Sequence, residues 1–315
     1  MCLEERLLEA GVSVVIPCYN SAETLDELVG RLVETLPQCH SSFEILLVND
    51  ASADSTWQVI DKLAKRHPSV IGIDLGRNFG QHNATLCGIR HARYNVCVTM
   101  DDDLQQPPEE MPKLLALLDE ELDLVYGVST SGTHALHRRA LSWSIRLAVR
   151  LLTRQPTVRD LSPFRAFRTS LRASFSEFNS PHSLVDVLLG WGTHRVGTVA
   201  VTHQPRQSGR SNYGWRKLFS AALLLWTGYS TAPLRFASLL GFAFVLFGIA
   251  TLGYVLAIWY MQGSLPGFPF LASTIAVFGG VQLFALGMIG EYIARIFQRS
   301  TGYPVYVVRR MTERP

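Results

Sequence analysis

The sequence has few cysteines for its 315 residues, and their spacing does not pair them. There are five, an odd number, and no C-x-x-C motif is present. This pattern argues against a disulfide framework and favours reduced thiols on the cytosolic side of a membrane. The opening residues, MCLEERLLEAG, lack the basic stretch and apolar core of a signal peptide, so we expect no cleaved leader. The length suffices for one large domain with an appendage, or for two domains.

Acidic residues are scarce in the middle of the chain. Residues 129–235 contain 15 Lys and Arg against 3 Asp and Glu, whereas residues 1–128 contain 9 against 21. The formal net charge of +3 conceals this asymmetry. An acidic half that can take a metal ion is therefore followed by a basic half suited to phosphates or an anionic surface. Nucleic acid would also suit the basic half, but it leaves the apolar C-terminus unexplained, so we expect no nucleic-acid partner.

Two long runs near the C-terminus have almost no charge. Arg235 is the one charged residue between positions 234 and 260, and residues 268–290 have none. At about 1.5 Å per residue, each run can span the roughly 30 Å hydrocarbon core of a bilayer. The link between them is uncharged and basic residues flank the pair, which predicts a transmembrane hairpin with both ends in the cytosol. The lengths disfavour the alternative, a hairpin buried in a soluble core.

Two stretches before the hairpin are basic and amphipathic. Residues 138–154 place four apolar side chains at helical spacing opposite five arginines, without an acid, and residues 213–229 have the same character. Both are predicted to be helices in the membrane interface, with an ordinary surface helix as the alternative. Residues 129–137 are mostly small and show no periodicity, so we expect a mobile loop there.

Short β-rich runs alternate with helical patterns in the first 128 residues. Their near-continuous apolar character predicts a parallel sheet covered by helices on both faces. Ligands bind such sheets at the carboxyl ends of the strands, which is where this chain places its polar residues. They are Asn20, Asp50, Arg77, and the run of Asp101, Asp102 and Asp103, after the first four strands in turn. The strands are expected at 12–17, 44–49, 70–75, 95–100 and 122–127, and the helices near 23–36, 55–67, 80–92 and 109–120.

Three adjacent carboxylates follow the fourth of these strands, in VCVTMDDDLQQPPEEMP. Their repulsion at the end of a buried strand costs free energy unless a cation sits among them. The hard ions Mg²⁺ and Mn²⁺ prefer oxygen ligands of this kind. The alternative is a solvated acidic turn or a helix N-cap.

Four motifs in order resemble the inverting family 2 glycosyltransferases of the GT-A fold: VVIPCYN, LLVNDASADST, LGRNFGQHNA and MDDDLQQPPEEMP. The C-terminal hairpin, ending in GMIGEYIARIF, narrows the resemblance to polyprenyl-phosphate glycosyltransferases. The resemblance covers essentially the whole chain and implies an α/β, Rossmann-like and mostly parallel catalytic domain. The implied divisions are residues 1–212 for this GT-A domain, 213–232 for a juxtamembrane amphipathic helix, 233–299 for two transmembrane helices, and 300–315 for a cytosolic tail.

The resemblance implies a metal site in the acidic turn. Asp101, Asp103 and the side-chain carbonyl of Gln105 would hold Mg²⁺ or Mn²⁺, which offsets the charge of a departing diphosphate. Asp101 and Asp102 would also border the nucleotide, although Asp102 stands where relatives usually have a small residue.

A nucleotide pocket at the other strand ends is also implied. Asp50 would bind the base or ribose, and His82 could touch the donor sugar, although a lone histidine is more often structural. For Arg77 and Asn78 the alternative is an ion pair with a helix cap. Relatives usually carry two Asp and a Gly where this chain has N-D-A at 49–51, so the base stays open. The implied nucleotide-binding residues are Pro17, Tyr19, Asn20, Asp50, Ser52, Arg77, Asn78, Gln81, Asp101 and Asp102.

Two later segments resemble catalytic and phosphate-binding loops of the family. VRDLSPFRAFR would place Asp160 beside the reacting sugar and Arg165 near the phosphates, with Asp103 as the third implied catalytic residue. For Asp160 a local salt bridge is the alternative. PRQSGRSNYGWRK would close over the donor diphosphate and meet the lipid phosphate. The implied phosphate- and acceptor-binding residues are Arg206, Arg210, Ser211, Tyr213 and Lys217.

The implied activity is inverting transfer of one sugar from a UDP- or GDP-sugar to a polyprenyl phosphate, such as undecaprenyl phosphate, at the cytosolic face of the inner membrane. Two alternatives stay open. A processive polysaccharide synthase shares the fold but would carry a Q-x-x-R-W motif, and no Trp in this chain follows an Arg. A non-catalytic membrane scaffold would not need polar residues at four strand ends. The sequence does not fix the donor sugar or the oligomeric state, a homo-oligomer included.

Overall fold

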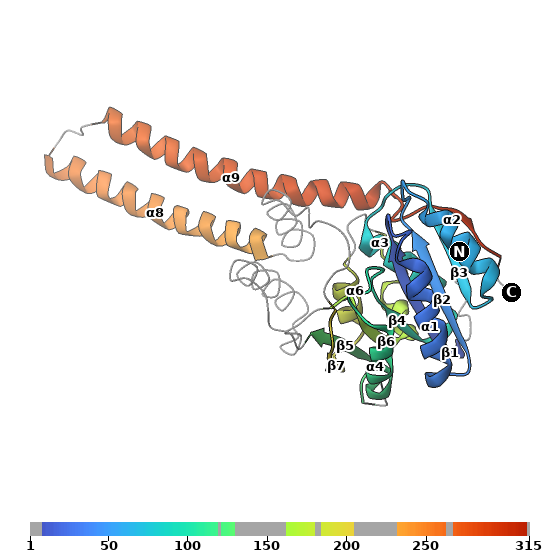
Figure 1. Ribbon diagram of the computed structural model, residues 1–315. Coiled ribbons are helices and arrows are strands. Elements are labelled where there is room, and N and C mark those ends of the chain that lie inside the picture. Colours follow the sequence, from blue (N-terminus) through green and yellow to red (C-terminus); the bar gives the residue numbers. More distant parts are fainter. Residues whose placement is uncertain are drawn as a thin grey trace. The chain divides into compact units, whose positions relative to one another are not determined.

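The computed structural model describes residues 8–118, 121–129, 162–179, 184–204, 232–262 and 267–313 (Figure 1). The chain divides into two units. One comprises residues 1–212 together with 302–315, and the other comprises residues 213–301. The first unit contains a β-sheet with helices on both faces, and the second contains two long helices.

In its described part, the first unit is built on one mixed sheet. Its strands are β1 (Glu9–Cys18), β2 (Phe43–Asn49), β3 (Val70–Leu75), β4 (Tyr94–Thr99), β5 (Leu124–Ser129), β6 (Arg165–Arg168), β7 (Val196–Val201) and β8 (Val308–Met311). They lie in the order β7-β5-β6-β4-β1-β2-β3-β8. β1 pairs in parallel with β2 and β4, and β2 pairs in parallel with β3. These four strands therefore end at one edge of the sheet, which we call the carboxyl edge.

Helices cover both faces of the sheet, as strands that are apolar on both sides require. They are α1 (Leu25–Cys39), α2 (Thr56–Arg66), α3 (Gln81–His91), the 3₁₀ turn η1 (Pro108–Glu110), α4 (Met111–Leu117), the 3₁₀ helix η2 (Thr169–Phe175) and α6 (Val185–Gly192). Alternate strand residues serve opposite faces. Val14 and Ile16 of β1 pack in one core with α1, α2 and α4, whereas Val15 packs in a second core with α3, η2 and α6.

The backbone is strained where three of the four parallel strands end. Asn20, Ala51 and Leu104 have positive φ angles of 55°, 52° and 59° and follow β1, β2 and β4. Few residues other than glycine adopt this left-handed conformation, and it persists where packed surroundings hold it, often at functional sites. The carboxyl edge is therefore where a site is expected.

The last strand corrects the prediction of a C-terminal tail over 300–315. In the structure, β8 pairs antiparallel with β3 at one end of the sheet, and Val305 is buried. The sequence does not reveal β8, because the strand has only four residues and its partner β3 lies far away along the chain. Asp74 and Arg310, which contact each other across this pair, are 236 positions apart.

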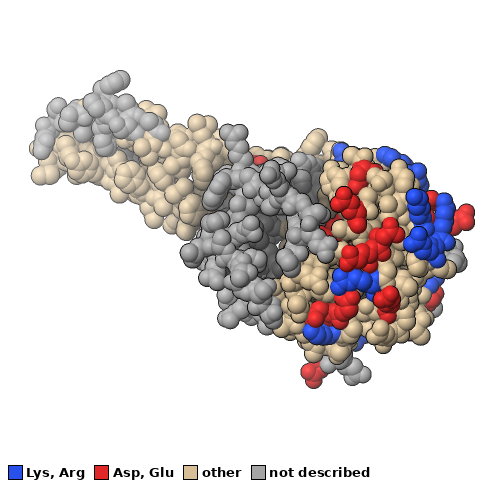
Figure 2. Space-filling view, viewed as in Figure 1, with Lys and Arg blue, Asp and Glu red and all other residues tan. Residues whose placement is uncertain are grey.

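The second unit confirms two long apolar helices, α8 (Ala232–Gln262) and α9 (Phe268–Ser300). Residues 234–261 and 277–294 are long and apolar enough to cross a membrane, by length and composition. Many of their large apolar side chains are exposed. In Figure 2 the described surface of these helices is almost free of charged side chains, whereas patches of acidic and basic side chains lie on the visible face of the first unit.

The strands and helices predicted in the first 128 residues are all present, with ends shifted by up to three residues. The mostly parallel α/β fold is confirmed. The helices predicted at 138–154 and 213–229, and all but the first residue of the loop predicted at 129–137, lie outside the described residues.

Candidate functional site

The acidic turn after β4 sends its three carboxylates to different partners. Asp101 accepts a hydrogen bond from the Gln81 side-chain nitrogen at 2.6 Å, and its own backbone N–H donates to the buried Gln106 at 3.0 Å. Gln81 is the first residue of α3. The first carboxylate of the turn is thus held against the start of the helix that follows β3.

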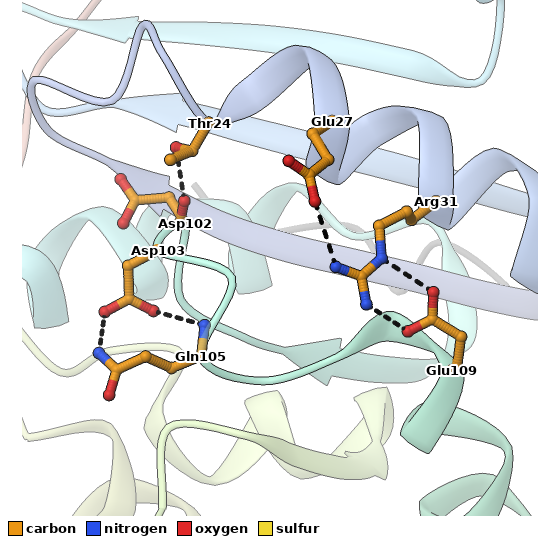
Figure 3. Close-up of polar contacts among 7 residues, drawn as sticks. All are labelled: Thr24, Glu27, Arg31, Asp102, Asp103, Gln105 and Glu109. Carbon is orange, nitrogen blue, oxygen red and sulfur yellow. Dashed lines mark hydrogen bonds and ion pairs between the residues drawn. The ribbon is translucent and has the colours of Figure 1, made fainter. Parts of the chain in front are cut away.

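Asp103 is held by Gln105, two residues further along the turn (Figure 3). The Gln105 backbone N–H donates to Asp103 Oδ1 at 3.2 Å, and its side-chain nitrogen donates to Oδ2. The carboxamide oxygen of Gln105 points away from Asp103. The side-chain carbonyl, which the resemblance assigns to a metal, therefore faces elsewhere in this conformation.

Asp102 fastens the acidic turn to the loop after β1. It accepts hydrogen bonds from the Ser21 hydroxyl and from the Tyr19 backbone N–H, the latter at 3.2 Å. The Thr24 hydroxyl donates to the Asp102 backbone carbonyl at 2.7 Å (Figure 3). Burial raises the pKa of Asp102, although the hydrogen bonds from Ser21 and Tyr19 act in the opposite direction. Its contacts give this carboxylate a role in shaping the two loops.

An ion pair on the surface fixes the far side of the same turn. Arg31 of α1 donates to both carboxylate oxygens of Glu109 in η1, at 2.8 and 2.6 Å, and to Glu27 at 3.4 Å (Figure 3). The hydrogen bonds from Arg31 lower the pKa of Glu109. The turn that carries the acids is therefore held both by Thr24, which precedes α1, and by Arg31 within α1.

A cavity of about 240 Å³ opens beside Asp101. Its wall combines the ends of β1 and β4, the first turns of α3, the segment before β6, and α6. The lining residues are Pro17, Gln81, His82, Thr85, Thr99, Met100, Asp101, Ser162, Pro163, Arg165 and Asp186. Among the described residues, this cavity brings three predicted nucleotide-site residues, Pro17, Gln81 and Asp101, to the same wall.

Arg165 lies in the cavity wall but is a buried ion-pair residue. It is 3% exposed, and its guanidinium contacts Asp186 of α6 and donates to the Thr99 hydroxyl at 3.0 Å. The Tyr126 hydroxyl donates to Asp186 at 3.2 Å. The pair thus joins β4, β5, β6 and α6 behind the cavity. Sequence reasoning assigned Arg165 to phosphates, whereas Asp186 and Thr99, its partners here, are protein groups.

His82 follows Gln81 on α3 and forms part of the cavity wall. His82 is exposed, and part of its surface faces the cavity. This environment lowers the pKa of His82 through desolvation, with Arg165 acting in the same direction and Asp186 against it. The imidazole is therefore neutral at pH 7 and offers one donor and one acceptor nitrogen to a bound group.

We expect protonation of His82 to weaken the folded protein. Because the folded state disfavours the charged imidazole, the unfolded chain binds this proton more readily. The free energy of unfolding should then fall as the pH drops below about 6.5, the ordinary histidine value. The substitution His82→Gln removes this contribution, so its unfolding should depend less on pH between 7.5 and 5.5. Parallel pH dependence in both proteins would contradict the expectation.

The loops after β1 and β2 interlock through Asn20 and Ser52. The Asn20 backbone N–H donates to the Ser52 hydroxyl at 3.0 Å, and the Asn20 side-chain oxygen accepts the Ala53 N–H at 2.9 Å. Tyr19, the preceding residue, is 52% exposed. In its left-handed conformation, Asn20 makes both hydrogen bonds that join the loops after β1 and β2. The exposed Tyr19 side chain lies next to it in the chain.

Asp50 holds the loop that follows β3. It is buried, and its two oxygens accept the backbone N–H groups of Phe79 and Gly80 at 2.7 and 2.8 Å. Burial raises the pKa of Asp50, and the two N–H donors oppose the rise. Asn78 contributes to the same loop, since its side-chain oxygen accepts the Gly80 N–H at 3.1 Å. Both side chains therefore hold the loop in its conformation. Sequence reasoning predicted instead that Asp50 and Asn78 contact the nucleotide, with a helix cap as the alternative for Asn78.

Arg77 makes cation–π contacts with two aromatic side chains. Its guanidinium carbon lies 4.6 Å from the Phe79 ring centre and 5.2 Å from that of Tyr303. It also donates to the Tyr303 hydroxyl at 2.7 Å. Tyr303 belongs to the segment after α9, so the C-terminal part of the chain contributes to the carboxyl edge.

Several predicted residues lie outside the described part of the chain: Asp160, Arg206, Arg210, Ser211, Tyr213 and Lys217. Conversely, sequence reasoning missed Asp186, Gln106 and Tyr303. A signal existed for Asp186, because it is one of the three acids between residues 129 and 235. Gln106 and Tyr303 gave no signal, since their roles depend on contacts across the fold.

The sequence is similar to a known protein family and to named relatives. A family model described as glycosyl transferase family 2 matches residues 13–175. The undecaprenyl-phosphate 4-deoxy-4-formamido-L-arabinose transferase of Shewanella sediminis is 33% identical over 309 residues, which cover 95% of this chain and 91% of the relative. Its namesake from Salmonella choleraesuis is 33% identical over 304 residues, covering 95% and 93%.

One solved structure supports the fold. The crystal structure of glucosyl-3-phosphoglycerate synthase from Mycobacterium tuberculosis, in complex with Mn²⁺, UDP and glucosyl-3-phosphoglycerate, superposes with a TM-score of 0.50. It is 18% identical and the match covers 69% of this chain and 78% of that one. At this identity the likeness concerns the fold alone.

Proposed function

The chain belongs to glycosyl transferase family 2, and from this premise we propose that it transfers one sugar from a nucleotide-sugar donor to a polyprenyl phosphate. The observation that carries the proposal is the cavity at the carboxyl edge, where Asp101 and Gln81 meet the ends of β1 and β4. The names of the two relatives support undecaprenyl phosphate as the acceptor. The two apolar helices support a place at the membrane. The basic residues that flank them support a cytosolic position for the first unit.

A divalent cation fits the chemistry of the acidic turn. Within the described residues no three His, Cys, Asp or Glu side chains form a complete metal site. Mg²⁺ and Mn²⁺ commonly bind through one or two carboxylates together with substrate phosphates, so a partial protein site suffices. Asp101 and Asp103 would hold the ion, and a half-turn of the Gln105 carboxamide would present its oxygen. When bound, the ion would offset the negative charge of the leaving diphosphate.

The groups of the chain position the donor. Asn20, Ser52 and the exposed Tyr19 would border the nucleotide, because they close the loops after β1 and β2. Gln81 orients Asp101 from the start of α3. His82, neutral at pH 7, would offer hydrogen bonds to the sugar in the cavity.

The reaction proposed is a direct displacement. An oxygen of the acceptor phosphate forms a bond to the anomeric carbon as the bond from that carbon to the diphosphate breaks, which inverts the configuration. A phosphate monoester has a second pKa near 6, so the attacking oxygen is largely ionised at pH 7 and no proton must be removed. The chain therefore contributes mainly by orienting two anions and excluding water between them.

Mass spectrometry of the lipid product tests the proposal. The full-length protein, in vesicles that contain undecaprenyl phosphate and Mn²⁺, is incubated with UDP- and GDP-sugars one at a time. We expect one donor to add a single sugar to the lipid, and we expect EDTA to prevent it. A ladder of sugars would instead support a processive synthase. An unchanged lipid with every donor would contradict transfer and favour a scaffold.

A further inference from the structure

The segment that follows α9 is built into the sheet beside β3. The Gly76 backbone N–H donates to the Val307 carbonyl at 2.8 Å. The Gly72 backbone N–H donates to the Thr312 hydroxyl at 2.9 Å, and the Thr312 backbone N–H donates to the Gly72 carbonyl at 3.0 Å. A Cβ atom at Gly72 would lie 2.5 Å from Ile60 and 3.2 Å from the Thr312 methyl, so close packing here requires glycine. Residues 302–313 are therefore an integral part of the first unit.

This segment supplies the cation for a buried carboxylate. Asp74 in β3 is 1% exposed and accepts the Arg310 Nε–H at 2.9 Å, with Arg309 at 3.9 Å. The Arg310 guanidinium also lies over the Trp57 ring, 4.5 Å from its centre. A buried carboxylate without a cation is strongly unfavourable. The two arginines of β8 thus lie beside the carboxylate that β3 buries.

The hydrogen bonds of Asp74 continue to the loops of the carboxyl edge. The Asn49 side-chain nitrogen donates to Asp74 at 2.7 Å, which turns the Asn49 oxygen toward Ser52. The Ser52 hydroxyl donates to that oxygen at 2.6 Å and accepts the Asn20 backbone N–H at 3.0 Å. Asn49 is buried, so its amide can satisfy both groups only in this orientation. A continuous polar path joins Arg310 to Asn20.

A second contact reaches the edge from the same segment. Tyr303 binds Arg77 through its hydroxyl and its ring, and the Phe79 ring of the same loop also lies near the guanidinium. The Phe79 N–H in turn donates to Asp50. The segment after α9 therefore contacts the loop after β3 directly and the loops after β1 and β2 through side chains.

We propose that Arg310 is a positioning residue for the donor-nucleotide loops, acting through Asp74, Asn49 and Ser52. The proposal rests on the proposed function in one respect, that these loops bind the nucleotide of the donor. Its physical basis is the charge of Asp74, which orients the Asn49 amide while Arg310 neutralises it. Without Arg310, Asp74 turns toward Arg309, and the Asn49 anchor for the loops is lost. The segment that ties the apolar hairpin to the sheet thereby also sets the geometry for donor binding.

Hydrogen exchange on the full-length protein tests the path without any ligand. In Arg310→Met we expect backbone amides of residues 19–21 and 49–53 to exchange at least about tenfold faster than in the wild type. The control Arg66→Met removes another surface arginine that pairs with a carboxylate, Asp26 at 3.5 Å, and should leave these amides unchanged. Loop exchange equal to the control, whatever the change in melting temperature, would overturn the proposal and leave Arg310 a merely structural residue.

Nucleotide affinity provides the second measurement. We expect Arg310→Met to weaken binding of UDP with Mn²⁺, or of GDP with Mn²⁺, by about tenfold, equivalent to roughly 1.4 kcal/mol. If the wild type binds neither nucleotide, the proposed function fails, while loop exchange still decides the positioning role. An unchanged affinity in Arg310→Met would count against the proposal.

A double variant separates charge from packing and guards against a variant that does not fold. In Asp74→Asn with Arg310→Met, the neutral amide needs no cation and its oxygen can still accept from Asn49. We expect loop exchange and nucleotide affinity to return to within about threefold of the wild type. If the double variant is as impaired as Arg310→Met, or as poorly folded, the path through Asp74 is wrong.

Discussion

Replacing Asp101 by asparagine is expected to lower turnover by about 10²- to 10³-fold, the range typical for losing one charged group that stabilises a transition state. Asp101 lines the cavity and is oriented by Gln81, so its charge faces the space proposed for the donor diphosphate. Asparagine keeps the shape and one oxygen but removes the charge. The Mn²⁺ concentration that gives half-maximal rate should rise in parallel, and steady-state kinetics over a Mn²⁺ series measures both effects.

Asp102→Asn is the matched control for this prediction, since it makes the same chemical change at the adjacent residue. The Asp102 side chain points to Ser21 and the Tyr19 N–H, and the amide oxygen of asparagine can accept from either. Burial already raises the pKa of Asp102, so the folded protein tolerates an uncharged group there better than at an exposed position. We expect a loss of less than about tenfold. Equal losses in both variants would point to damage of the whole turn and would remove Asp101 from its proposed role.

The sequence predicted the sheet well because its signals are local. Each of the first four strands is a near-continuous apolar run, and each helix between them repeats its apolar residues at helical spacing. Parallel pairing then follows from the alternation of strands and helices. The same reasoning could not find β8, whose two arginines resemble a solvated tail until β3 supplies the buried Asp74. A pairing over 236 positions leaves no local pattern.

The sequence predicted where the polar residues of the candidate site gather, but not which contacts the individual residues make. The carboxyl edge and the acidic turn follow from strand ends alone. Asp50 illustrates the difficulty: the sequence shows an acid after a strand, but the N–H groups of Phe79 and Gly80 that donate to it belong to another loop. Arg165 is a second case, because its partner Asp186 lies on α6 and no spacing connects them. Roles of this kind depend on contacts that only the fold creates.

The last expectation is that residues 1–232 alone do not form a stable nucleotide-binding unit. Without residues 302–315, Asp74 keeps its place in β3 but loses both arginines that lie near it in the described structure. Removing one partner of a fully buried ion pair costs roughly 3–5 kcal/mol, and the cost here is smaller because the side chains of Arg309 and Arg310 are more than half exposed. The buried Val305 is lost as well. Because the whole stability of a domain is about 5–15 kcal/mol, these losses together are enough to unfold it or nearly so.

A chain in which residues 302–315 are rejoined to residue 232 isolates the effect of β8 from that of the apolar hairpin. A Gly/Ser linker of about 20 residues has a mean reach of roughly 25 Å and gives the segment freedom to find β3. We expect the rejoined chain to melt cooperatively in circular dichroism and to bind UDP or GDP with Mn²⁺, and residues 1–232 to do neither. If residues 1–232 fold and bind nucleotide as tightly as the rejoined chain, the sheet is complete without β8, and Asp74 must then be satisfied by groups other than Arg309 and Arg310.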